Sequence, residues 1–199
     1  MQLTPLIQAS NTLRYLAGTK SYGITYSTSP GSTAIPNIFS GYVDAAFANQ
    51  DDCKSTSRYV FIAAGGAIMW RSKKQTTVAL SSTEAEYIAL AEAACEACWL
   101  RHLYNELGYP QKLPTLIRGD NNGSIAMAKN PQFHQRSKHI AIRWHLICDL
   151  IKDDILNIEE CWDPEQTADI LTKPLTCFKH HKHVGEFGCR FDEQATLVA

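Results

Sequence analysis

A long alanine-rich segment over residues 81–108 follows three β-prone segments, and this order restricts the chain to a small number of folds. The first β-prone segment covers residues 39–48. The next two, 58–64 and 67–71, are separated by a Gly-Gly pair, which is typical of a hairpin. Three meandering strands followed by a helix predict an α/β domain rather than a helical bundle or a β-sandwich.

The predicted helix has recognisable ends. Ser81 and Glu84 fit a capping box at its start, and Gly108 followed by Pro110 ends it.

The remaining segments alternate between strand and helix patterns. They are a strand over 114–120, a helix over 124–130, an amphipathic helix over 137–154, a strand over 155–161 and a short helix over 165–175. The order is therefore β-β-β-α-β-α-α-β-α. It predicts a five-stranded mixed sheet flanked by helices.

The two ends of the chain differ from this central part. Residues 5–17 have helical spacing of leucines, and a short β-prone run follows at 22–27, too little to form a core. Residues 178–199 have no clear period. We therefore expect three parts: a front segment 1–36, the main domain 37–178, and a partly ordered tail 179–199.

Composition excludes several classes of protein. The 199 residues are 45% hydrophobic with a formal charge of −1, which excludes a disordered chain and a histone-like polyanion binder. No apolar run is long enough to cross a membrane, and the first residues lack the pattern of a signal peptide. Seven irregularly spaced cysteines favour reduced thiols, so we expect an intracellular protein with no membrane partner.

Four carboxylates lie at the ends of predicted elements: Asp44, Glu86, Asp120 and Asp169. Taken singly, each is typical of a turn or a helix start. Taken together, they form an oxygen-only set that suits Mg²⁺ or Mn²⁺ at the ends of central strands. Two such ions are a known arrangement for cleaving phosphodiesters.

Four stretches carry a resemblance to a known family: residues 40–48, 53–90, 119–145 and 167–175. They resemble the ribonuclease H domain of copia-type retrotransposon Pol polyproteins over about residues 38–178. Residues 11–27 are similar to the segment that connects this domain to the reverse transcriptase, so 1–36 is expected to be a remnant of that segment.

The resemblance implies an RNase H-like fold and cleavage of the RNA strand of RNA/DNA hybrids with two Mg²⁺ ions, for which Mn²⁺ can substitute. It implies that Asp44 bridges both ions, Glu86 and Asp120 complete one site, and Asp169 holds the ion that activates water. Glu86 is preferred to Glu84, because a large apolar residue and a helical run follow it.

The chain departs from the family at a few positions. Ala46 and Phe47 stand where relatives usually carry Asp and Trp, and Arg58 stands where they usually carry Gly. The loop before the last predicted helix lacks the histidine that ribonucleases H often have. None of these departures replaces a candidate metal ligand.

Two basic groups are candidates for contacts with nucleic-acid phosphates. They are Lys73 and Lys74, and then Arg136, Lys138, His139, Arg143 and His145. A solvated helix face is the alternative for the second group, although the family shares this segment. Contacts of this kind bind without sequence preference and weaken as salt rises.

The sequence thus predicts a retrotransposon-derived endoribonuclease acting on RNA/DNA hybrids, with the reverse transcriptase part of the polyprotein as a further partner. A catalytically silent nucleic-acid-binding remnant is the alternative. The family implies cytoplasmic virus-like particles and later access to the nucleus.

Overall fold

The computed structural model describes residues 5–26, 38–129, 138–171, 173 and 175–191. Its centre is a five-stranded mixed sheet in the order β4-β3-β2-β5-β6. The strands are β2 (Ser40–Ala46), β3 (Thr56–Ala63), β4 (Gly66–Lys74), β5 (Thr115–Gly119) and β6 (Leu156–Glu160). β2, β3 and β4 pair antiparallel, while β5 is parallel to both β2 and β6. The predicted mixed sheet is confirmed.

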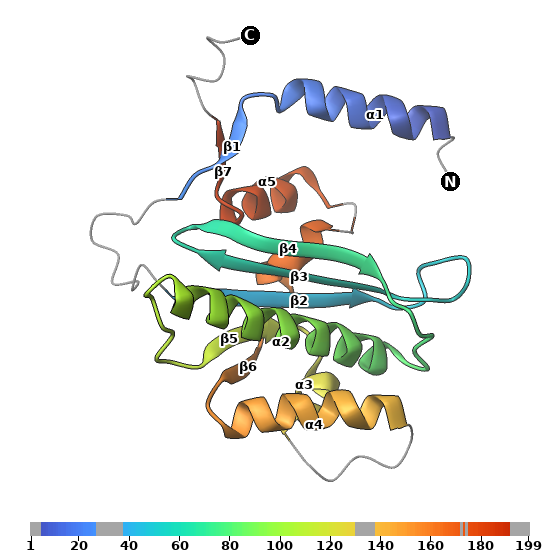
Figure 1. Cartoon of the computed structure of the whole chain (residues 1–199). Coiled ribbons are helices and arrows are strands. Elements are labelled where there is room, and N and C mark those ends of the chain that lie inside the picture. Colours follow the sequence, from blue (N-terminus) through green and yellow to red (C-terminus); the bar gives the residue numbers. More distant parts are fainter. Residues whose placement is uncertain (1–4, 27–37, 130–137, 172, 174, 192–199) are drawn as a thin grey trace.

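Three helices pack on one side of the sheet, as Figure 1 shows. They are α2 (Ser82–Glu106), α3 (Asn122–Lys129) and α4 (Lys138–Lys152). The buried face of α2 contains Ala85, Ala89, Ala93 and Ala97 at four-residue spacing, which lets the helix backbone approach the sheet closely. Val43, Phe61 and Ile117 belong to the same core cluster as these alanines, apart from Ala85.

The other side of the sheet carries a smaller core. Val60 and Ala67 of the β3–β4 hairpin pack there with Phe187. Phe187 follows α5 (Cys177–Glu186), which lies on this side of the sheet in Figure 1. Apolar burial on both faces explains why residues 59–63 of β3 form an unbroken apolar run rather than an alternating one.

The described part of the expected tail is regular. α5 crosses the expected boundary between residues 178 and 179, and β7 (Cys189–Phe191) pairs antiparallel with β1 (Tyr22–Ile24). Thr176 caps α5 through a bond from Lys179 N. The pairing of β1 with β7 joins segments near the two ends of the chain, so no local sequence pattern could indicate it. The division into three parts stays a prediction.

The helix expected over 165–175 is wrong in type. The structure has two short 3₁₀ helices there, η1 (Asp163–Glu165) and η2 (Thr167–Leu171). Prolines at 164 and 174 leave only nine residues between them, and the residue before a proline disfavours the α conformation.

The helix expected over 5–17 is present as α1 (Pro5–Gly18). Within the described residues, no helix is long and apolar enough to span a bilayer.

Candidate metal and nucleic-acid site

Asp44 lies near the end of β2, the central strand of the sheet. The residue is only 2% exposed, and its position in the sheet is opposite Arg58 of β3. Asp120 directly follows β5, which runs parallel to β2. Because the carboxyl ends of parallel strands meet at one edge of a sheet, both aspartates come to the same edge.

Glu86 comes to this edge from the first turns of α2. Ser81 caps the helix by accepting a bond from Glu84 N at 3.1 Å, and the Glu84 carboxylate accepts one from Leu80 N at 2.8 Å. The cap therefore uses Glu84, much as predicted, although its carboxylate reaches Leu80 rather than the cap residue itself. Glu86 is buried against the sheet, with 8% exposure.

One oxygen from each of Asp44, Glu86 and Asp120 lies within 4.8 Å of the others. Burial, followed by the charges of Asp44 and Asp120, raises the pKa of Glu86 to about 9. Burial and then Asp44 raise the pKa of Asp120 as well. Crowded carboxylates, among them Glu86 and Asp120 with raised pKa values, are a set that a hard divalent cation would stabilise.

Asp169 lies on η2 and is 2% exposed. Gln166, beside it, donates from Nε2 to Val43 O at 3.0 Å and so holds η2 against β2. Asp169 is close enough to Asp120 to contribute to its raised pKa. Lys173 lies beside it, with its Nζ 2.6 Å from Asp169 Oδ1 and 3.9 Å from Asp44 Oδ1.

A buried network supports η2 from α5. His183 is 1% exposed, and its Nδ1 lies 2.7 Å from Glu186 Oε2. Thr167 Oγ1 donates to the same Glu186 oxygen at 2.7 Å. The helix that was not predicted therefore positions the segment that carries Asp169.

Arg58 is the group that sequence reasoning did not connect with the acids. Its Nη1 donates to Asp44 Oδ2 at 2.6 Å, and the side chain is 1% exposed. Its Nε is buried with no hydrogen-bond partner among the described residues. Burial lowers the pKa of Arg58, while the charges of Asp44, Asp169 and Glu86 raise it. The sequence signal for this ion pair was an arginine directly before an apolar run, because arginine is almost never fully buried unless it is paired.

The donor set fits a divalent ion in its chemistry, because all three clustered side chains offer carboxylate oxygens. The surroundings fit less well, because Arg58 binds one Asp44 oxygen and Lys173 lies near the other. The chain therefore has the ligands for a metal centre and two cationic side chains beside them.

The basic candidates lie on both sides of the acids. Lys73 and Lys74 are exposed on β4, which is an edge strand of the sheet. Lys74 Nζ lies 2.8 Å from Asp52 Oδ1. Arg143 is half-buried and His145 exposed on α4, which packs near β6 at the other edge. Arg136 lies outside the described residues, as do the side chains of Lys138 and His139.

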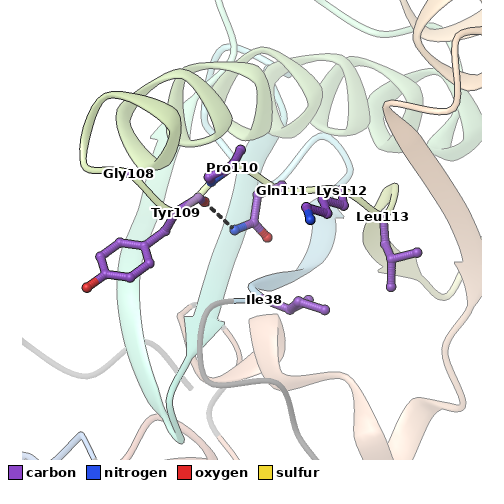
Figure 2. Close-up of a pocket in the computed structure, with 7 residues that line it drawn as sticks. All are labelled: Ile38, Gly108, Tyr109, Pro110, Gln111, Lys112 and Leu113. Carbon is purple, nitrogen blue, oxygen red and sulfur yellow. Dashed lines mark hydrogen bonds between the residues drawn. The ribbon is translucent and has the colours of Figure 1, made fainter.

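A hollow of about 500 Å³ lies beside the loop that follows α2 (Figure 2). It is lined by Ile38 and by the loop from Gly108 to Leu113, where Gln111 Nε2 donates to Tyr109 O at 3.2 Å. Glu86 lies near the other end of this 25-residue helix. The hollow is therefore not part of the acidic site.

No family model matches the chain, but individual known proteins are similar to it. The chain is 41% identical over 162 residues to the retrovirus-related Pol polyprotein from transposon TNT 1-94 of Nicotiana tabacum, covering 81% of this chain. It is 41% identical over 165 residues, 82% of the chain, to the corresponding polyprotein from transposon RE1 of Arabidopsis thaliana. The chain spans only 12% and 11% of the lengths of these relatives.

Among solved structures, the chain is similar to LC11-RNase H1, isolated from compost by a metagenomic approach. The TM-score is 0.51 at 16% identity, covering 68% of this chain and 92% of that one. At this identity the likeness establishes the fold.

Proposed function

This chain belongs to the copia-type retrotransposon Pol polyproteins and has the ribonuclease H fold, and we propose that it is a metal-dependent nuclease for the RNA strand of RNA/DNA hybrids. The observation that carries the proposal is the meeting of Asp44, Glu86 and Asp120 at one edge of the sheet. These side chains come from three separate elements, and crowding three carboxylates that are buried or half-buried is costly unless a cation or proton compensates them.

The residues proposed to hold divalent ions are Asp44, Glu86, Asp120 and Asp169. Bound Mg²⁺ or Mn²⁺ would supply Lewis-acid stabilisation of a phosphodiester and a more acidic water. The protein's own part is to hold the four carboxylates close together and oriented. Burial keeps bulk water away from Asp44 and Asp169, and the Gln166 bond to Val43 O keeps Asp169 beside the strand.

Hybrid binding is assigned to the basic residues on the two sides of the acids. Five strands at about 4.8 Å spacing place β4 and β6 roughly 20 Å apart, with the acids near the middle strands. Lys73 and Lys74 would contact phosphates on one side, and Arg143 and His145 on the other. Recognition would rest on helix shape and 2′-hydroxyl groups rather than on base edges.

The proposal is tested by incubating the purified chain with a labelled RNA/DNA hybrid in Mg²⁺ and in Mn²⁺. We expect RNA cleavage that is lost in EDTA and in Asp44→Asn, because that change removes a carboxylate shared by the cluster. Uncut hybrid, with parent and Asp44→Asn indistinguishable in both metals, would count against a nuclease. Circular dichroism of both proteins controls for folding.

The binding assignment gives a separate expectation. Lys73→Ala should weaken hybrid binding by a similar factor for every sequence and reduce the slope of log affinity against log salt by about 1. Fluorescence anisotropy at several salt concentrations measures both quantities. Lys152→Ala is the control, because Lys152 is exposed on α4 beside Asp149. An unchanged slope for Lys73→Ala would remove Lys73 from the interface.

A second function is favoured by one observation. The bond between Arg58 and Asp44 compensates a candidate ligand without any metal. A chain that binds hybrids but does not cut them would fit this arrangement. In the assay above, salt-sensitive binding of the hybrid by an inactive parent chain would support it.

A further inference from the structure

Arg58 supplies the acidic cluster with a positive charge from inside the protein. Residues 44 and 58 are direct partners in the antiparallel pairing of β2 and β3, so their side chains project to the same face. The ion pair at 2.6 Å is a charge-assisted bond between two side chains that are 1% and 3% exposed. The pairing register therefore fixes a cation beside the carboxylate at the centre of the candidate metal site.

Lys173 is a second cation near the cluster, but its situation differs. Its side chain is 43% exposed, and its Nζ is 3.9 Å from the nearer Asp44 oxygen. A flexible lysine with that much exposure can turn into solvent when another cation arrives. Arg58 has no such route, because it is enclosed on all sides and lies on a central part of the sheet.

The pair also changes what Asp44 can offer. Arg58 occupies Oδ2, which leaves Oδ1 as the oxygen open to a further ligand. The charge of Arg58 extends beyond this bond, since Asp169 and Glu86 also interact with it. A divalent ion among these acids would meet repulsion from a cation that cannot leave, in an environment that screens charge poorly.

We propose that Arg58 acts as an internal competitor of divalent cations, holding Asp44 in an ion pair and weakening metal binding at the site formed with Glu86 and Asp120. This inference rests on the proposed metal-dependent function and deepens it. It identifies the residue that limits metal affinity in this chain. Replacing Arg58 by an uncharged residue should strengthen metal binding at least about tenfold, which corresponds to about 1.4 kcal/mol.

The experiment compares the parent with Arg58→Gly and Arg58→Met in direct Mn²⁺ titrations by calorimetry. Gly is the residue that the resemblance predicts here, and Met retains most of the buried volume without the charge. Arg71→Met is the matched control. Arg71 is an arginine on the neighbouring strand whose charged neighbours are Glu92 and Glu96 rather than the clustered acids. Both Arg58 variants should bind Mn²⁺ at least about tenfold more tightly than the parent and Arg71→Met. Equal affinity in all four proteins would overturn the proposal.

Thermal unfolding supplies an independent readout. In EDTA the Arg58 variants should be less stable than the parent, because the acids lose their compensating charge. Mn²⁺ should then raise their melting temperatures much more than that of the parent. If an Arg58 variant is unfolded in EDTA, Mn²⁺ should refold it. Refolding of the variant at Mn²⁺ concentrations that leave the melting temperature of the parent unchanged supports the proposal. Failure to refold both variants at any Mn²⁺ concentration contradicts it.

Hybrid cleavage by the same proteins separates this inference from the proposed function. Tighter Mn²⁺ binding without cleavage would keep Arg58 as the competitor and refute the nuclease. Cleavage by the parent, with Mn²⁺ affinity unchanged in the Arg58 variants, would keep the nuclease and refute the competitor.

Discussion

Glu86→Gln is expected to abolish RNA cleavage while making the metal-free chain more stable at neutral and alkaline pH. The loss of cleavage, at least about a hundredfold, follows from removing one ionised ligand of the site. The gain in stability follows from the buried cluster, in which Glu86 is destabilised as an anion by burial and by Asp44 and Asp120. Glutamine has the shape of the protonated side chain and carries no charge.

The sign of the pH effect follows from the raised pKa. Glu86 titrates at about 9 in the folded chain, against an ordinary value of 4.5. Between these values the unfolded chain has released a proton that the folded chain keeps, so rising pH favours unfolding. The contribution to stability is complete below the ordinary pKa and is lost progressively up to about pH 9.

The measurement is thermal unfolding in EDTA from pH 4 to pH 9. The difference in stability between Glu86→Gln and the parent should be near zero at the acid end and should grow by at most about 1.4 kcal/mol for each pH unit. Each kcal/mol corresponds to roughly 2–4 °C in melting temperature for a chain of this size. Glu84→Gln is the matched control. Its amide oxygen can still accept from Leu80 N, so cleavage and the pH profile should stay those of the parent. Equal profiles for Glu84→Gln and Glu86→Gln would contradict the assignment.

Gly188→Ala is expected to destabilise the chain by at least about 2 kcal/mol. Gly188 has a φ of +75°, a left-handed conformation that costs an L-residue roughly 1–2 kcal/mol. A Cβ there would also lie 2.7 Å from Gly65 O and from Gly66 Cα, which are backbone atoms of the β3–β4 turn. Neither atom can move without disturbing the hairpin. The cost of the left-handed backbone conformation and the cost of the steric overlap therefore add.

The consequence reaches the candidate site through α5. Gly188 accepts a bond from Thr25 N at 2.9 Å, and Phe187 accepts one from Ala67 N at 2.9 Å. Loosening these contacts loosens the helix whose Glu186 holds Thr167, two residues before Asp169. Urea unfolding should therefore show the loss of stability, and cleavage should fall with it.

Gly185→Ala is the control, three residues before Gly188 and in the last turn of α5. A Cβ at Gly185 would have nothing within 4 Å. Alanine in a helix interior is better than glycine by roughly 0.5–1 kcal/mol, so this variant should be slightly more stable than the parent. Loss of stability in both variants to the same extent would refute the close approach of Gly188 to the hairpin.

Short-range patterns were sufficient to predict most of the central fold. The hairpin follows from two apolar runs around a Gly-Gly pair, and the start of α2 follows from Ser81 and Glu84. Each of these signals lies within a few residues of the element that it predicts. For the same reason Asp44, Glu86 and Asp120 could be selected as element-end carboxylates before their proximity was known. Their metal and catalytic roles stay predictions.

Four features depended on contacts between distant segments. β7 forms because β1, far away in the sequence, offers it a partner, and α5 is held by Phe187 against the β3–β4 hairpin. The Arg58–Asp44 pair depends on the register of β2 and β3, and the position of Lys173 depends on how η2 lies on the sheet. Local patterns were therefore enough to predict the central strands, the long helix and the carboxylates at their ends, because caps, turns and periodicity act over a few residues. Which charges meet depended on the folded chain, because strand register and burial set the distances between those charges and their desolvation.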